Sequence, residues 1–427
     1  MHLYDLPIIA VLIGLALYTI LGGADFGAGI WQLVSLLTPA SSAEGRGRSR
    51  AIREHAHHAI GPVWEANHVW LIFVLTVTWT AYPAAFGALA STLAVPLLFA
   101  GVGIIFRGTA YALRSGTAQR RELRIIDGLF SAASFLTPFA LGTMVGAIAS
   151  GRVPKGNAAG NLISSWLNPT SLLAGALAVV LSAYLAAVYL AADADRHDET
   201  ELAGAFRRRA LVTAVIAGAI ALAGLPVLHA DAHRLYVGLL EGPGLVGVGI
   251  SLLAGVTTLG LVLARRYGQA RISAALAVVG MIVGWALAQQ PRLLPDLTVA
   301  QAAAPTTTLI AVLIAIGMGI VILFPSLGLL FGLFLRGGFD DQPLAVILAV
   351  PTDGGRTRSA TVSVRVAIAG LLGGLGFLTF ANPPWAHTIG VISLGVCALA
   401  TLAAVNPTEL ADLEGASITE SPSPPGA

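Results

Sequence analysis

Long apolar runs recur along almost the whole chain and are separated by short polar stretches. A helix needs about 20 apolar residues to cross the hydrocarbon core of a bilayer. The pattern therefore predicts an all-α, polytopic membrane protein with about eleven transmembrane helices. We expect these helices at 7–37, 60–80, 84–106, 124–149, 170–191, 210–229, 244–264, 272–290, 307–335, 362–381 and 386–405.

The positions of the basic residues predict the orientation of these helices. The chain has 24 Lys and Arg residues, and all but four fall in the odd-numbered gaps between the expected helices. The four exceptions are Arg152, Lys155, Arg234 and Arg292. Since short cytoplasmic loops collect Lys and Arg, we expect the N-terminus outside and the C-terminus in the cytoplasm.

Four segments follow from the same pattern. We expect a nine-helix membrane domain over 1–338 and a cytoplasmic linker rich in Gly and Pro over 339–361. A two-helix hairpin should follow over 362–405. The tail, 406–427, is first acidic and then rich in Ser and Pro, which predicts disorder.

Composition excludes several classes of protein. Only 11% of the residues are charged and 56% are hydrophobic, whereas soluble domains carry about 25% charged residues. The single cysteine, Cys397, leaves no disulfide framework and no cysteine metal cluster. No basic stripe with interleaved aromatic residues is present, so we expect no nucleic-acid partner. The first apolar run has no basic flank and no small-residue cleavage site, and we interpret it as a retained helix.

Asp25 is an ionisable residue within the first apolar run, where such residues are costly and are candidates for function. It lies 18 residues after Pro7, or about 27 Å along a helix that enters from outside. This depth places it towards the cytoplasmic side. The plainer interpretation is a packing motif, because four glycines close to Asp25 allow a neighbouring helix to approach.

The second helix begins with a dense group of polar and aromatic residues. Glu65 and His68 are three positions apart and share one helix face. Glu65 lies near the cytoplasmic start of its helix, at a depth similar to that of Asp25. A carboxylate and an imidazole held here would suit a proton relay. The alternative is an ordinary helix start, with Trp64 and Trp70 in an interfacial aromatic belt.

Further polar residues have weaker signals. Arg107 ends the third helix and Asp127 begins the fourth. They could pair with each other or with Glu65, or Arg107 could extend to a lipid phosphate. Two polar loops could bind a metal and three methionines could ligate a haem iron. We instead expect solvated loops and packing residues. These residues are His55, His57 and His58, then His229, Asp231 and His233, and finally Met144, Met281 and Met318.

Four motifs resemble subunit II of the cytochrome bd quinol oxidases. Gly-Ala-Asp-Phe-Gly-Ala-Gly at 23–29 is similar to a motif of the family's first helix. Gly-Pro-Val-Trp-Glu-Ala-Asn-His-Val-Trp-Leu at 61–71 is similar to a motif of its second helix. Phe106-Arg107 resembles the end of the third helix, and Leu-Asn-Pro at 167–169 with Leu-Leu-Ala-Gly at 172–175 resembles the start of the fifth. The resemblance covers roughly 1–338.

The resemblance implies an electrogenic oxidase of the bacterial plasma membrane. A haem-bearing subunit I would be the partner, with haem b and haem d, or haem b only. The complex would oxidise quinol and reduce dioxygen to water in aerobic respiration. The resemblance also allows for small single-helix subunits in the complex, and it implies that the complex contacts lipid and quinone. This chain would hold no haem, metal or catalytic residue. It would contribute a proton path of Asp25, Glu65 and His68, supported by Trp64, Asn67, Trp70, Arg107 and Asp127.

The sequence departs from the family pattern in three places. Gly22 stands where some members carry a second acid, Glu65 replaces an Asp found in many members, and the last two helices lie outside the pattern. We expect two four-helix bundles, helices 1–4 and 5–8, with the remaining helices peripheral. The rival functions are a proton-coupled transporter and a purely structural partner subunit. A transporter would be expected to carry ionisable residues at the midplane, in repeated or broken helices.

Overall fold

The computed structural model describes 2–37, 43–58, 63–114, 120–335, 365–366, 368–370, 372–374, 377 and 384–404. The chain divides into two units, Met1–Ser326 and Leu327–Ala427. The expected linker at 339–361 and the expected tail at 406–427 lie outside the described residues, so their character stays a prediction.

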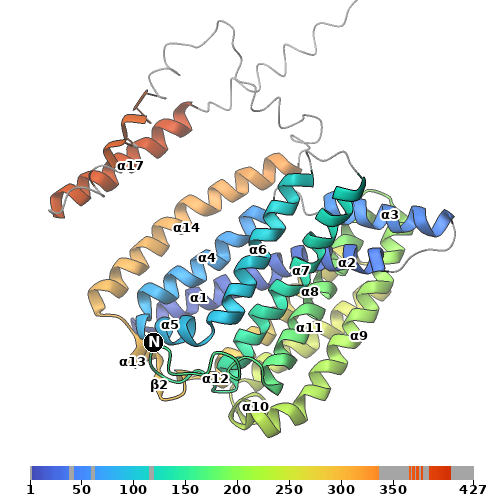
Figure 1. The fold of residues 1–427 in the computed structure, drawn as a ribbon, viewed down its shortest axis with the longest axis horizontal. Coiled ribbons are helices and arrows are strands. Elements are labelled where there is room, and N and C mark those ends of the chain that lie inside the picture. The colour runs from blue at the N-terminus through green and yellow to red at the C-terminus, as the bar shows by residue number, and fades with distance from the viewer. Residues whose placement is uncertain are drawn as a thin grey trace, which may run out of the picture. The chain divides into compact units, whose positions relative to one another are not determined.

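Helices form nearly all of the first unit, which confirms the all-α class (Figure 1). The described residues contain eight helices long and apolar enough to cross a membrane, and two shorter apolar stretches, Asn67–Ala81 and Thr388–Cys397. The helices are α1 Asp5–Leu17, η1 Tyr18–Gly22, α2 Gly23–Leu37, α3 Ala43–His58, α4 Val63–Ala81, α5 Pro83–Thr92, α6 Ala94–Arg114, α7 Arg120–Ala149, α8 Pro169–Arg196, α9 Thr200–Asp231, α10 His233–Leu240, α11 Leu245–Leu263, α12 Tyr267–Gln289, α13 Val299–Ala302, α14 Thr306–Leu335 and, in the second unit, α17 Pro384–Ala404. A small antiparallel pair, β1 Arg292–Leu294 and β2 Leu297–Thr298, precedes α13.

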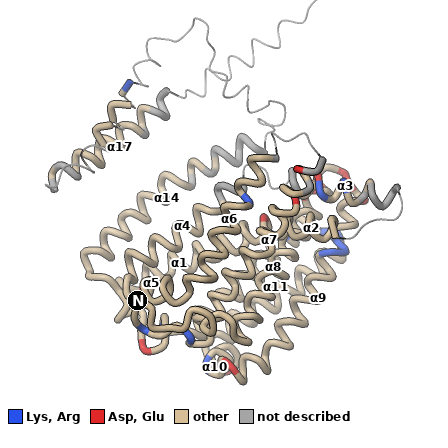
Figure 2. Tube along the Cα trace, in the orientation of Figure 1, with Lys and Arg blue, Asp and Glu red and all other residues tan. Residues whose placement is uncertain are grey.

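Charged residues gather at the two ends of the helices of the first unit, and the middle is almost free of them (Figure 2). This distribution is expected if lipid surrounds the middle of the helices, because charge is expensive there. The exceptions within the middle therefore carry the most information about function.

The first expected span contains a π-helical turn. Tyr18–Gly22 forms this turn, and α-helical geometry resumes at Gly23. A π turn accommodates one extra residue and is frequently found at functional sites. It divides the span into α1, which packs against α4, and α2, which packs against α7 and α8.

The third expected helix, 84–106, is not continuous. It is divided at Leu93 into α5 and α6, and α6 extends to Arg114. Pro96 lies in the first turn of α6. Proline has no N–H to donate to the carbonyl of the residue four positions earlier, here Thr92. The interruption follows from this missing bond, which hydropathy alone does not detect.

Glycines let α2 approach α8 closely, which places the first half of the chain against the second. A Cβ atom at Gly27 would overlap the carbonyl oxygen of Ser182 and lie 2.6 Å from the Cβ of Ala186. The two backbones are therefore in direct contact here. Small residues at such crossings are the usual means of close helix packing in membranes.

Asp231, at the end of α9, joins three segments at one end of the bundle. Arg152 Nη1 and Nη2 donate to Asp231 Oδ2 and Oδ1 at 2.9 and 2.5 Å. Thr170 donates its backbone N–H and its hydroxyl to Oδ2 at 3.1 and 2.6 Å. The hydrogen bond from Arg152 to this carboxylate raises the pKa of the guanidinium. Asp231 thus connects the start of α8 with the loop that follows α7. His229 lies with its ring edge-on to His233, 4.9 Å away.

We expect Asp231→Asn to destabilise the protein by about 1–2 kcal/mol, because the amide removes the charge and one acceptor from this set of bonds. Thermal unfolding of the purified protein, followed by tryptophan fluorescence, measures the effect. Glu241→Gln is the control, because Glu241 is an exposed acid close by in the sequence. Equal unfolding temperatures for the two variants would contradict the prediction.

The second unit contains a close contact between two helical segments. Gly370 packs against α17, where a Cβ atom would lie 2.7 Å from the Ser393 carbonyl oxygen and 2.9 Å from the Cys397 nitrogen. Gly374 packs one turn further along, against Leu394. This contact is what a helical hairpin requires. The bounds of the expected hairpin, 362–405, stay a prediction because much of 362–381 lies outside the described residues.

Candidate functional site

Asp25 is buried within the helix bundle, three residues after the end of the π turn. It is the third residue of α2, and its side chain is 4% exposed. Asn67 on α4 donates from Nδ2 to the carbonyl oxygen of Leu21, within the π turn, at 3.4 Å. The start of α4 therefore lies beside the π turn that precedes Asp25.

Arg107 on α6 is the ionic partner of Asp25. Its Nη2 donates to Asp25 Oδ1 and, at 2.9 Å, to the Asp25 backbone carbonyl. The arginine is 1% exposed. It is buried and pairs with Asp25, a partner that the sequence pattern did not suggest, so it does not extend to lipid phosphate. The side chain of Glu65, one of the expected partners, lies outside the described residues. Two opposite charges held together at low dielectric attract strongly, which offsets part of the cost of burying each one.

Aromatic rings enclose the guanidinium. The Arg107 Cζ atom lies 4.7 Å from the ring centres of both Phe26 on α2 and Phe130 on α7. A cation between two π faces gains electrostatic stabilisation and is shielded from lipid. Arg107 therefore connects α2, α6 and α7.

Tyr18 and His68 complete what we define as the Asp25 site, formed by Tyr18, Asp25, Phe26, His68 and Arg107. The His68 ring lies 6.1 Å from the rings of both Tyr18 and Phe26. The Tyr18 ring is 6.4 Å from Phe26, edge-on. Segments from η1, α2, α4 and α6 thus bring a carboxylate, a guanidinium, a hydroxyl and a histidine together in one buried place.

Several polar atoms of the Asp25 site have no hydrogen-bond partner among the described residues. They are Asp25 Oδ2, Tyr18 Oη, and Arg107 Nε and Nη1. Buried polar atoms are nearly always hydrogen-bonded, and internal water commonly supplies the partner when protein does not. A group of such atoms at one place is what a site for internal water requires.

The structure describes the side chains of most predicted site residues, but not of all of them. It brings Asp25, Asn67, His68 and Arg107 together. Trp64 and Glu65 belong to α4, but the structure describes only their backbone and not their side chains. Trp70 contacts Phe73 edge-on at 6.4 Å, and Asp127 is half-buried on α7.

Tyr18, Phe26 and Phe130 were not singled out from the sequence. Tyr18 precedes Asp25 by seven positions, which is about two helical turns, so a search for polar aromatics on the face of the buried acid could have found it. Phe26 and Phe130 carry no comparable signal, because their role depends on Arg107 lying between them.

Metal binding has little support in the described part of the chain. No group of three or more His, Cys, Asp or Glu side chains there could hold a metal ion. Met144 packs against an apolar cluster and Met318 is 59% exposed. These surroundings do not fit axial haem ligands, so no step of the function proposed below uses a haem bound by this chain.

Comparisons with known proteins agree with this architecture. The family model described as cytochrome bd terminal oxidase subunit II matches 3–334. A putative cytochrome bd menaquinol oxidase subunit II from Bacillus subtilis is 22% identical over 331 residues, covering 75% of this chain and 92% of that protein. Subunit 2 of the Escherichia coli cytochrome bd-I ubiquinol oxidase is 27% identical over 195 residues, covering 43% of this chain and 49% of that protein.

A solved structure gives the same result for the fold. The bd oxidase from Geobacillus thermodenitrificans contains a chain that superposes with a TM-score of 0.59 at 23% identity, covering 79% of this chain and 99% of that one. The family model covers most of the chain, including every residue of the Asp25 site. This protein therefore belongs to the cytochrome bd terminal oxidase subunit II family.

Proposed function

We propose that this chain is the subunit of a quinol oxidase that conducts protons from the cytoplasm towards the haems of subunit I. The observation that carries this proposal is the buried Asp25–Arg107 pair, surrounded by polar atoms that lack partners among the described residues. A subunit that only filled space in the membrane would have no need for buried charges of this cost.

The overall reaction sets the requirement for protons. Each dioxygen takes four electrons and four protons to become two waters, and two quinols supply the four electrons. The haems of subunit I would supply the redox chemistry. If quinol releases its protons outside and the protons for water come from the cytoplasm, the reaction is electrogenic. A route across the inner half of the membrane is then needed.

The geometry of Asp25 suits one step of such a route. Arg107 holds Oδ1, whereas Oδ2 has no partner among the described residues and remains available to water. A proton can therefore arrive at Oδ2 while Arg107 keeps the carboxyl group in place. We propose that Glu65 and His68, on the adjoining turns of α4, exchange protons with it. Asn67, Trp64, Trp70 and Asp127 would support the packing around them.

The proposed direction of proton flow depends on orientation. The strong excess of Lys and Arg in alternate loops supports an outside N-terminus and a cytoplasmic C-terminus, in a bacterial plasma membrane. We further propose that quinone and lipid contact the complex, and that the partner carries haem b with or without haem d.

Asp25→Asn and Glu65→Gln test the proposal in the purified complex of both subunits. Each should lower quinol-driven oxygen consumption and proton uptake in proteoliposomes about tenfold, because a neutral amide cannot carry a proton between neighbours. Glu65→Gln should keep the wild-type haem content, whereas Asp25→Asn also leaves Arg107 without its anion and should lower the amount of complex, so both rates are taken per haem. Ser35→Ala is the control, since Ser35 is a buried polar residue on the same helix as Asp25.

The result also separates the rival functions. Unchanged turnover and proton uptake in both variants, at normal haem content, would contradict the proton path and favour a purely structural subunit. A chain that purifies without a haem protein, and that moves a solute with protons, would instead favour the transporter.

A further inference from the structure

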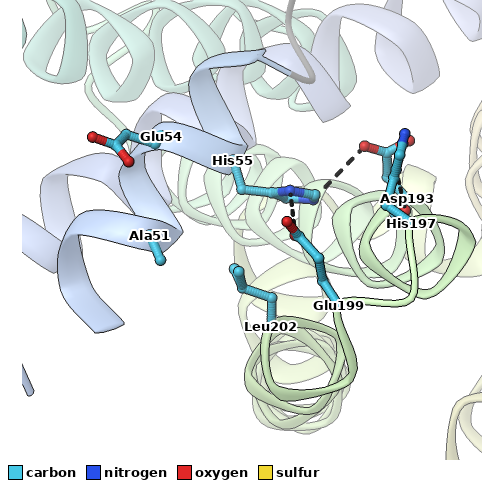
Figure 3. Close-up of a pocket in the computed structure, with 7 residues that line it drawn as sticks. All are labelled: Ala51, Glu54, His55, Asp193, His197, Glu199 and Leu202. Atoms are coloured by element: carbon cyan, nitrogen blue, oxygen red, sulfur yellow. Dashed lines mark hydrogen bonds and ion pairs between the residues drawn. The ribbon is translucent and has the colours of Figure 1, made fainter. Parts of the chain in front are cut away.

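A pocket at the end of α3 contains titratable side chains that the proposed proton path does not use. It has a volume of about 320 Å³ and lies between α3, the end of α8 and the start of α9. Figure 3 shows His55 extending from α3 towards the turn that joins α8 to α9. The titratable residues lining what we define as the His55 pocket are Glu54, His55, Asp193, His197 and Glu199.

His55 lies between two carboxylates. Its Nδ1 is 3.2 Å from Glu199 Oε2, and its Nε2 is 3.7 Å from Asp193 Oδ2. The imidazole is 11% exposed, whereas the two acids are 25% and 47% exposed. One flat face of the ring lies near Phe206, with ring centres 5.7 Å apart.

The protonation state of His55 decides how many of these contacts are favourable. A neutral imidazole has one N–H, so it can donate to only one of the two acids while its other nitrogen presents a lone pair to the second. The imidazolium has two N–H groups and a positive charge, and it can donate to both. The observed arrangement, with an acid at each ring nitrogen, is therefore the arrangement that suits the charged form.

The other charged groups around the pocket do not replace this contact. Glu54 points away from His55 and pairs with Arg50 at 2.7 Å (Figure 3). His197 interacts through Nδ1 with the backbone carbonyl of Asp193 at 2.9 Å, which fixes it at the end of α8. The two carboxylates facing His55 from α8 and α9 thus share the imidazole across the pocket, and Arg271 on α12 also interacts electrostatically with Asp193.

His55 lies on the face by which α3 docks. Ile52 and Ala56, three residues before and one after it, are 3% and 0% exposed and belong to the apolar core of the bundle. The opposite face carries the exposed Arg50 and Glu54. Docking of α3 therefore combines a small apolar contact with the two ionic contacts of His55, which depend on a proton.

We infer that His55, Asp193 and Glu199 form a pH-dependent clasp that holds α3 against the α8–α9 turn. Protonation of His55 closes the clasp, since the imidazolium can then donate to Glu199 from Nδ1 and attract Asp193, which lies 3.7 Å from Nε2. Loss of the proton as pH rises leaves one acid facing a lone pair, which loosens α3. The clasp therefore responds to the pH of the compartment that the pocket faces.

Hydrogen–deuterium exchange of the resting two-subunit complex tests the clasp. After correction for the intrinsic effect of pH, the amides of 43–58 should exchange about fivefold faster at pH 8.5 than at pH 6, as expected for loss of a partly exposed ionic contact. The amides of α10 serve as the internal reference, since they lie outside the pocket. Equal protection of 43–58 at the two pH values in the wild-type complex would overturn the inference.

Variants show which side chains cause the pH dependence of exchange in 43–58. His55→Gln and the pair Asp193→Asn with Glu199→Gln should each remove the pH dependence, and His55→Arg should keep α3 protected at both pH values. Glu54→Gln is the matched control and should behave like the wild type. A pH dependence that persists in His55→Gln would also overturn the clasp. Exchange is measured in the resting complex and needs no turnover. Its result is therefore independent of the test of the proton path at Asp25.

Discussion

Replacing Arg107 with Ala should destabilise the protein by about 3–5 kcal/mol, because it leaves the Asp25 carboxylate buried without its cation. The guanidinium has two roles that a small side chain cannot fill: it donates to Asp25 and it lies between the rings of Phe26 and Phe130. In cells, a loss of this size would prevent most of the complex from accumulating. Quantification of spectroscopic haem per milligram of membrane, and thermal unfolding of any purified complex, measure the effect.

Two further variants show that charge is the cause. Arg209→Ala is the control, because Arg209 also lies over aromatic rings, 5.4 Å from Trp31 and 5.6 Å from Phe206, yet has no carboxylate partner in the described part of the chain. It should cost about 1 kcal/mol. The double variant Asp25→Leu with Arg107→Met should recover most of the stability by removing both charges together. If the double variant were as unstable as Arg107→Ala, packing rather than the unpaired charge would explain the loss.

Gly27→Ala should have the second largest effect, with a loss of about 3 kcal/mol or more, although it adds only one methyl group. The new Cβ atom would overlap the backbone carbonyl of Ser182, which cannot rotate away as a side chain could. The helices α2 and α8 would have to separate, and the backbone around Asp25, two residues earlier, would move with α2. Thermal unfolding of the purified complex measures the loss of stability.

Gly255→Ala on α11 is the matched control, since no atom lies within 4 Å of a Cβ atom placed there. Alanine favours helix over glycine by up to about 1 kcal/mol, so this variant should be as stable as the wild type or slightly more so. Nearly equal unfolding temperatures for Gly27→Ala and Gly255→Ala would contradict the proposed backbone contact.

Sequence patterns predicted the membrane-spanning segments well because each span must satisfy its own backbone within lipid and be apolar over a fixed length. The ends were less predictable. The α9 helix starts at Thr200 rather than at 210, since its first turns are polar and lie beyond the apolar run. The division between α5 and α6 depends on one missing hydrogen bond and is invisible to hydropathy.

Asp25 was identifiable because a charge in an apolar run is conspicuous, but its partner was not. Arg107 is 82 residues away in sequence and stands at the end of its apolar run, where arginine usually extends to the membrane surface. Only the packing of α6 against α7 and of α7 against α2 shows that it turns inwards. The His55 pocket was missed for a similar reason, because its two acids come from a turn about 140 residues later.

The π turn at Tyr18–Gly22 makes this span sensitive to the deletion of a single residue. Each residue of an α-helix advances the side-chain direction by about 100°, so the extra residue of a π turn offsets the two halves of the span from one another. Residues before the turn are directed at α4 and residues after it at α7 and α8. Deleting one residue here would straighten the helix, yet it would swing Asp25 away from Arg107. The Asp25–Arg107 pair therefore constrains the number of residues in this turn more than their identity.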